Sequence, residues 1–90
     1  MDKKIEKILS TALNNIIKSK NLKFKESKNL NIIKNFDSLD IVTLIIETEQ
    51  LLENEFDNHI PLSNNDTFDV KKSPLNKWSN WIKFVKKKYN

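Results

Sequence analysis

The most apolar segment of this 90-residue chain, residues 36–57, reads FDSLDIVTLIIETEQLLENEFD. Its apolar residues recur with helical spacing and are too numerous for the single stripe of a surface helix. We therefore predict a helix over residues 38–56 that forms the centre of the fold and is buried on more than one side at its start. The apolar residues are Leu39, Ile41, Val42, Leu44, Ile45, Ile46, Leu51, Leu52 and Phe56.

The beginning of this helix carries the first candidate functional residue, Ser38, directly after Asp37. A side chain at a helix N-terminus lies close to unpaired backbone N–H groups and to the positive end of the helix dipole. Such a position suits a simple N-terminal cap, by either Asp37 or Ser38, and equally suits a covalently attached phosphate. Both interpretations stay open on these two residues alone.

The end of the helix is marked by Asp57-Asn58-His59-Ile60-Pro61. Asn and Asp favour turns, and the residue before a proline avoids the helical conformation. We therefore predict that the helix ends close to Phe56.

The chain before the central helix divides into two parts. Residues 3–20 are predicted to form an amphipathic helix, and residues 21–37 lose the helical period, which predicts a long loop with a short helical turn at its end. The apolar stripe of the first helix consists of Ile5, Ile8, Leu9, Ala12, Leu13, Ile16 and Ile17.

After the central helix we expect a loop over residues 63–68 that includes one turn of a short helix. Ser73-Pro74 is a typical helix start, because a capping residue precedes a proline at the first helical position. The last helix should bury one stripe, with one of the two tryptophans partly exposed. This stripe is Leu75, Trp78, Ile82, Val85 and Tyr89. Trp81 and Phe84 lie beside it and should widen it or be partly exposed.

The predicted fold is all-α, a single domain over residues 1–90 with three main helices and one short helix. No alternating strand pattern, internal repeat or linker competes with this interpretation.

Charge is distributed unevenly along the chain. All 16 basic residues are lysines outside residues 36–57, whereas seven of the 12 acidic residues lie inside, so the segment carries −7 and the remainder +11. A pI near 9.3 suggests a nucleic-acid partner. The chain has no arginine, however, the residue whose forked guanidinium reads bases and phosphates. We therefore predict no nucleic-acid partner.

The residue types that most active sites need are scarce. Without cysteine or glycine there is no disulfide, thiolate nucleophile or glycine-rich phosphate loop. A single histidine, His59, leaves little from which to build a triad or a zinc site. We predict that the chain is not an enzyme and binds no metal. The lack of 18 consecutive apolar residues and of a signal-type N-terminus predicts a cytoplasmic protein with no membrane partner.

Two motifs at the ends of the central helix carry a resemblance to a known family. Asp37-Ser38-Leu39 opens the helix, and Phe56-Asp57-Asn58-His59-Ile60-Pro61 closes it. The chain resembles the acyl carrier protein family, whose members have the same Asp-Ser-Leu and a similar Phe-to-Ile-Pro ending. The resemblance covers most of the chain and implies a small acyl-carrier-like bundle. It also implies a 4′-phosphopantetheine arm, derived from coenzyme A, on Ser38.

The resemblance implies partners as well. A phosphopantetheinyl transferase would attach the arm, whose thiol would carry an acyl or aminoacyl group as a thioester. Acyl-activating or acyl-transfer enzymes of a specialised fatty-acid- or polyketide-like pathway would dock on the acidic helix over residues 38–56, and the carrier would be a monomer. The implied docking residues are Asp37, Leu39, Asp40, Ile41, Glu47 and Glu49.

The chain departs from the usual pattern of the family in three respects. The central helix is longer by about one turn, Thr43 stands where many carriers have an acidic residue, and the overall charge is basic. The longer helix, together with the Ser73-Pro74-Leu75 start of the last helix, indicates a divergent bacterial branch used in a specialised pathway.

Three other functions stay open. The chain could be a helical interaction module with the carrier fold and no arm, a lysine-rich nucleic-acid binder, or an aminoacyl carrier of the D-alanyl or peptidyl type. The last differs only in its loading enzyme.

Overall fold

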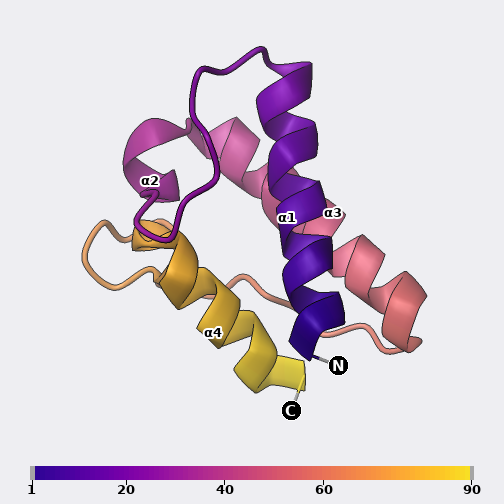
Figure 1. The fold of residues 1–90 in the computed structure, drawn as a ribbon. Coiled ribbons are helices and arrows are strands. Elements are labelled where there is room, and N and C mark those ends of the chain that lie inside the picture. Colours follow the sequence, from indigo (N-terminus) through magenta and orange to yellow (C-terminus); the bar gives the residue numbers. More distant parts are fainter. Residues whose placement is uncertain (1, 90) are drawn as a thin grey trace.

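The computed structural model describes residues 2–89, in which helices joined by loops are present and no strand is found (Figure 1). Three long helices and one short helix make up the fold, which agrees with the predicted all-α class and number of helices, and the short helix lies before the central helix. Their bounds are α1 Asp2–Ser19, α2 Ile32–Asn35, α3 Ser38–Phe56 and α4 Trp78–Tyr89, with a 3-10 turn, η1, at Pro74–Asn76.

α1 and α3 pack against each other along much of their length (Figure 1). α1 is strongly amphipathic, and its buried stripe is the one that the sequence predicts. α4 packs on the other side of α1, where an ion pair joins Lys86 Nζ to Glu6 Oε2 at 2.6 Å. The buried residues of α1 are Ile5, Leu9, Ala12, Leu13 and Ile16.

α3 begins and ends where the sequence indicates. Asp37 is its N-cap, and its carboxylate accepts a hydrogen bond from the backbone N–H of Asp40. The helix ends at Asp57, which takes the left-handed conformation with φ of 54°. Glycine usually occupies this position because it has no Cβ to clash with the backbone. The chain has no glycine, so the side chain of Asp57 is held in this strained backbone conformation.

The loop between α1 and α2 is held by hydrogen bonds to α4. The backbone N–H groups of Trp78 and Ser79 donate to the carbonyl oxygens of Leu30 and Lys28, at 2.8 and 3.0 Å. These loop carbonyls satisfy N–H groups that a helix N-terminus leaves unpaired. The loop therefore determines where α4 begins.

Two predictions for the C-terminal third were wrong. Residues 65–68 form hydrogen-bonded turns and not a short helix, because the Asn64 and Thr67 side chains bond to nearby backbone N–H groups. Ser73 does act as a cap, but only for η1, and α4 itself begins at Trp78.

The core contains both tryptophans, so the expected exposed tryptophan was also wrong. Trp78 and Trp81 are fully buried with Leu75 and Val85, and Trp81 stacks on the half-buried Phe84 at 5.5 Å between ring centroids. Trp81 therefore widens the buried stripe, which is one of the two outcomes expected from the sequence. No helix within residues 2–89 is long and apolar enough to cross a bilayer.

Candidate functional site

Ser38 is the first residue of α3, and its side chain is exposed. The capping function belongs to its neighbour, since Asp37 Oδ1 accepts from Asp40 N at 2.8 Å. No hydrogen bond among residues 2–89 engages the Ser38 hydroxyl. Of the two capping possibilities, the structure thus selects Asp37 and leaves Ser38 chemically free.

The backbone around Ser38 is favourable for a negatively charged group. The N–H of Ile41 donates to the Asp37 carbonyl at 3.0 Å, and the N–H of Asp40 is taken by the cap. The N–H groups of Ser38 and Leu39 have no acceptor inside the helix, because they belong to its first turn. These two N–H groups and the positive end of the helix dipole can receive a negative charge beside the hydroxyl.

The buried acid near Ser38 pairs with a cation from the turn that follows α1. Asp40 is 6% exposed, and Lys20 Nζ lies 3.4 Å from its Oδ1. This contact is an ion pair without hydrogen-bond geometry, since Asp40 Oδ1 has no hydrogen-bond partner. The pair joins the residue after α1 to the first turn of α3 and places a positive charge beside Asp40.

Next to Ser38 the outer side of α3 is apolar. Leu39, Val42 and Ile46 are 66%, 39% and 57% exposed, and their spacing places them on one side of the helix. Phe68, from the 63–72 loop, faces Val42 and Ile46 across a hollow of about 240 Å³. We refer to Leu39, Val42, Ile46 and Phe68 as the apolar face.

This apolar face corrects two expectations. The start of α3 is not buried on more than one side, because the surplus apolar residues point to solvent. Asp40 and Ile41, 6% and 3% exposed, lie in the interior, so neither can touch a docked partner directly. Of the implied docking residues at the start of α3, Asp37 and Leu39 are on the surface.

The acidic side chains further along α3 mostly bond within the fold. Glu47 Oε1 accepts from Asn15 Nδ2 and Glu49 Oε2 from the backbone N–H of Leu62, both at 2.7 Å. Glu53 Oε1 lies 3.2 Å from His59 Nδ1 and Glu55 Oε1 lies 3.1 Å from a lysine of α1. These acidic side chains therefore have partners within the fold, although Glu53 and Glu55 stay exposed, and the exposed side of α3 nearest Ser38 is apolar.

Sequence reasoning missed Val42, Ile46 and Phe68 as surface residues. In α3 the sequence shows more apolar residues than one stripe needs, but it does not show which of them face solvent. For Phe68, in a polar loop, the sequence offers no comparable signal.

The described residues contain no group of three or more His, Asp or Glu side chains placed to hold a metal ion. His59 is exposed at the end of α3, far along the helix from Ser38. Ser38 therefore has no imidazole beside it that could accept its proton, and its hydroxyl is exposed on the surface.

Comparison with known proteins identifies no relative: no protein-family model, curated protein or solved structure matches the chain.

Proposed function

We propose that this protein is a carrier whose Ser38 bears a 4′-phosphopantetheine arm. The observation that supports this most directly is the free Ser38 hydroxyl at the N-terminus of α3, with Asp37 serving as the cap. A serine needed for capping would be engaged with the backbone, as Ser73 is with Leu75 N. The resemblance of Asp37-Ser38-Leu39 to the acyl carrier motif points to the same residue.

The attachment reaction needs only an accessible hydroxyl from this chain. The Ser38 oxygen would form a bond to the β-phosphorus of coenzyme A, and the adenosine 3′,5′-bisphosphate portion would leave as the pyrophosphate bond breaks. The serine proton would pass to a base of the transferase. The resulting phosphodiester would lie against the free N–H groups of the first turn of α3, which favours it by about 0.3–1 kcal/mol at an exposed site.

The arm supplies a thiol that carries an acyl or aminoacyl group as a thioester, and the protein supplies its presentation. A carrier of this kind needs no catalytic side chain of its own. Partner enzymes, including the transferase, would dock on the apolar face beside Ser38. An exposed apolar patch next to a modification site suits brief, weak contacts with several partners.

The test is the intact mass of the protein after incubation with coenzyme A and a broad-specificity phosphopantetheinyl transferase. We expect a gain of one phosphopantetheinyl group, lost in Ser38→Ala and retained in Ser27→Ala, which changes an exposed loop serine. Circular dichroism should show both variants folded. A folded wild-type protein that gains no mass, or a Ser38→Ala variant that still gains it, would refute the assignment.

The second candidate is an interaction module without an arm, which the apolar face also favours. In that case the wild-type protein would not be modified, and substitutions on the apolar face would abolish binding to its partner. An aminoacyl carrier would be modified in the same way and would differ only in the enzyme that loads it.

A further inference from the structure

The C-terminal part of the chain carries charge of one sign only. Residues 70–89 contain seven lysines and no Asp or Glu, whereas residues 1–69 contain nine lysines and all 12 acidic residues. A general bias toward lysine would explain the lysines, but it would not remove the acidic residues from this segment. The helix of the segment, α4, packs on the other side of α1 from the acidic α3 (Figure 1).

Most lysines of this segment have no charged partner in the fold. Lys86 is the exception, because its ammonium group pairs with Glu6 Oε2 at 2.6 Å. The other six make no ion pair within residues 2–89, and all six are exposed. These six residues are Lys71, Lys72, Lys77, Lys83, Lys87 and Lys88.

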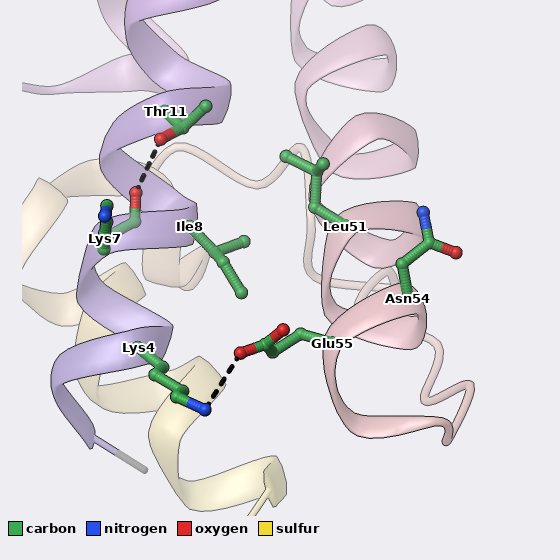
Figure 2. A pocket seen from close by; sticks show the side chains of 7 residues that line it. All are labelled: Lys4, Lys7, Ile8, Thr11, Leu51, Asn54 and Glu55. Atoms are coloured by element: carbon green, nitrogen blue, oxygen red, sulfur yellow. Dashed lines mark hydrogen bonds and ion pairs between the residues drawn. The ribbon is translucent and has the colours of Figure 1, made fainter.

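Around α1 and α3, by contrast, acidic residues offset part of the positive charge. Lys4 Nζ lies 3.1 Å from Glu55 Oε1, across the groove between the two helices (Figure 2). Lys20 is paired in the same way with Asp40. The outer side of α4 has no acidic residue of its own that could do this.

On the outer side of α4, lysines surround an aromatic ring. Phe84, Lys87 and Lys88 have the i, i+3, i+4 spacing that brings side chains together on one side of a helix. They line a hollow of about 420 Å³, and Lys88 Nζ lies 5.5 Å from the centre of the Phe84 ring. Lys83 lies one turn before Lys87. We refer to Lys83, Phe84, Lys87 and Lys88 as the basic face.

A surface with a single sign of charge suits a partner that has no fixed charge pattern. Protein partners set their register by matching charges of both signs, and the basic face has only one. Nucleic acids are read mainly by arginine, which the chain lacks. Anionic lipids can diffuse to positions beneath the lysines, whose long stems let the ammonium groups reach the headgroup phosphates. A phenylalanine among lysines also suits the boundary between headgroups and acyl chains.

We propose that the basic face adsorbs to a membrane surface rich in anionic phospholipid. Binding would be electrostatic and reversible, because the apolar side of α4 is held in the core by Trp78, Trp81 and Val85 and does not insert. The expectation of no membrane partner rested on the lack of a spanning segment and of a signal sequence, and adsorption to a surface needs neither. The proposal does not depend on an arm at Ser38.

The test is cosedimentation of the protein with vesicles of phosphatidylcholine in which about a third of the lipid is phosphatidylglycerol. Vesicles of phosphatidylcholine alone are the comparison. We expect binding to the anionic vesicles only, and we expect it to fall steeply as the salt concentration approaches 1 M, where the Debye length is about 3 Å. Replacing Lys83, Lys87 and Lys88 together by Gln should lower the partition coefficient roughly a hundredfold, since each lysine near an anionic surface contributes about fivefold.

Two matched variants separate the basic face from overall charge. Replacing the same three lysines by Arg keeps the charge and should keep the binding. Replacing Lys18, Lys23 and Lys25 by Gln removes as much charge from exposed positions at the far end of α1 and in the loop after it, and should keep most of the binding. Circular dichroism checks that every variant is folded.

Ser38→Ala should bind the vesicles like the wild type, which separates this surface from the proposed carrier function. The proposal is wrong if phosphatidylcholine vesicles bind equally well or if salt has no effect. It is also wrong if the two Gln variants lose binding equally, or if a DNA duplex of random sequence binds while anionic vesicles do not.

Discussion

Trp78 Nε1 donates a hydrogen bond of 3.1 Å to Glu26 Oε2, across 52 residues of sequence. The other oxygen of the same carboxylate accepts from Ser10 Oγ at 2.6 Å and from Asn14 Nδ2 at 3.0 Å. A single glutamate of the long loop thus connects α1 to the start of α4. It does so at the point where the Lys28 and Leu30 carbonyls cap α4.

Glu26→Ala should lower the free energy of unfolding by about 1.5–3 kcal/mol, because the charged acceptor disappears and the indole N–H of Trp78 stays buried. Urea unfolding followed by tryptophan fluorescence measures this directly. Lys25→Ala, next to it in the same loop, should change the value by less than about 0.5 kcal/mol. Equal stability of the two variants would show that the loop is held by its backbone contacts alone.

The helices could be predicted from the sequence because their causes are local. The apolar period gives α1 and α3 to within about a residue at each end, and Asp37 and Asp57 mark the ends of α3. The start of α4 could not be predicted, since loop carbonyls distant in sequence satisfy its first N–H groups. The contacts of Glu26 could not be predicted for the same reason, since its partners also lie far from it in the sequence.

The candidate site was predicted in part. Ser38 follows from the motif, and its exposure agrees with an attachment site. The division of α3 into a buried and an exposed apolar side depends on where the 63–72 loop and α1 pack, which no local pattern encodes. For this reason the acidic residues were predicted to form a docking surface, although most of them contact other residues of the fold.

Leu39→Gln should slow the transfer of phosphopantetheine to Ser38 roughly tenfold while leaving stability within about 0.5 kcal/mol, because Leu39 is exposed and would be buried only in the complex. The measurement is the initial rate of mass gain. Val70→Gln is the matched control, since Leu39 and Val70 are both 66% exposed and only Leu39 adjoins Ser38 on α3. A modification rate equal in both variants would remove the apolar face from the docking surface.

Asp57→Gly should raise the free energy of unfolding by about 1 kcal/mol. Asp57 has a φ of 54° at the end of α3, where a side chain crowds the backbone and a negative charge faces the negative end of the helix dipole. Glycine removes both penalties at the expense of a more flexible unfolded chain. The check is the urea midpoint. Asn58→Gly, one residue on and without a positive φ, should not stabilise; a loss of stability in Asp57→Gly would contradict the strain argument.

Ionisation of Tyr89 should lower the stability of the protein at alkaline pH. Burial of its ring raises the pKa of the phenol, the carboxylates of Glu49 and Glu53 raise it further, and a backbone hydrogen bond from Ile60 opposes them. The folded pKa is therefore above that of the unfolded chain, so folding favours the protonated phenol. The resulting stabilisation is fully present below the unfolded pKa near 10 and is lost as pH rises through the folded pKa.

Because Tyr89 is the only tyrosine, tyrosinate absorbance reports this one group. In the native protein its titration midpoint should lie at higher pH than in urea-unfolded protein.

Lysines also lose charge in this pH range, so the effect on stability is isolated by comparison with Tyr89→Phe. That variant keeps the ring contact with Phe56, 5.5 Å between centroids, and loses the hydrogen bond to the Asn58 carbonyl. The stability of the wild type should fall more steeply above pH ~10 than that of Tyr89→Phe. Parallel pH profiles would mean that the phenol ionises as easily in the fold as outside it.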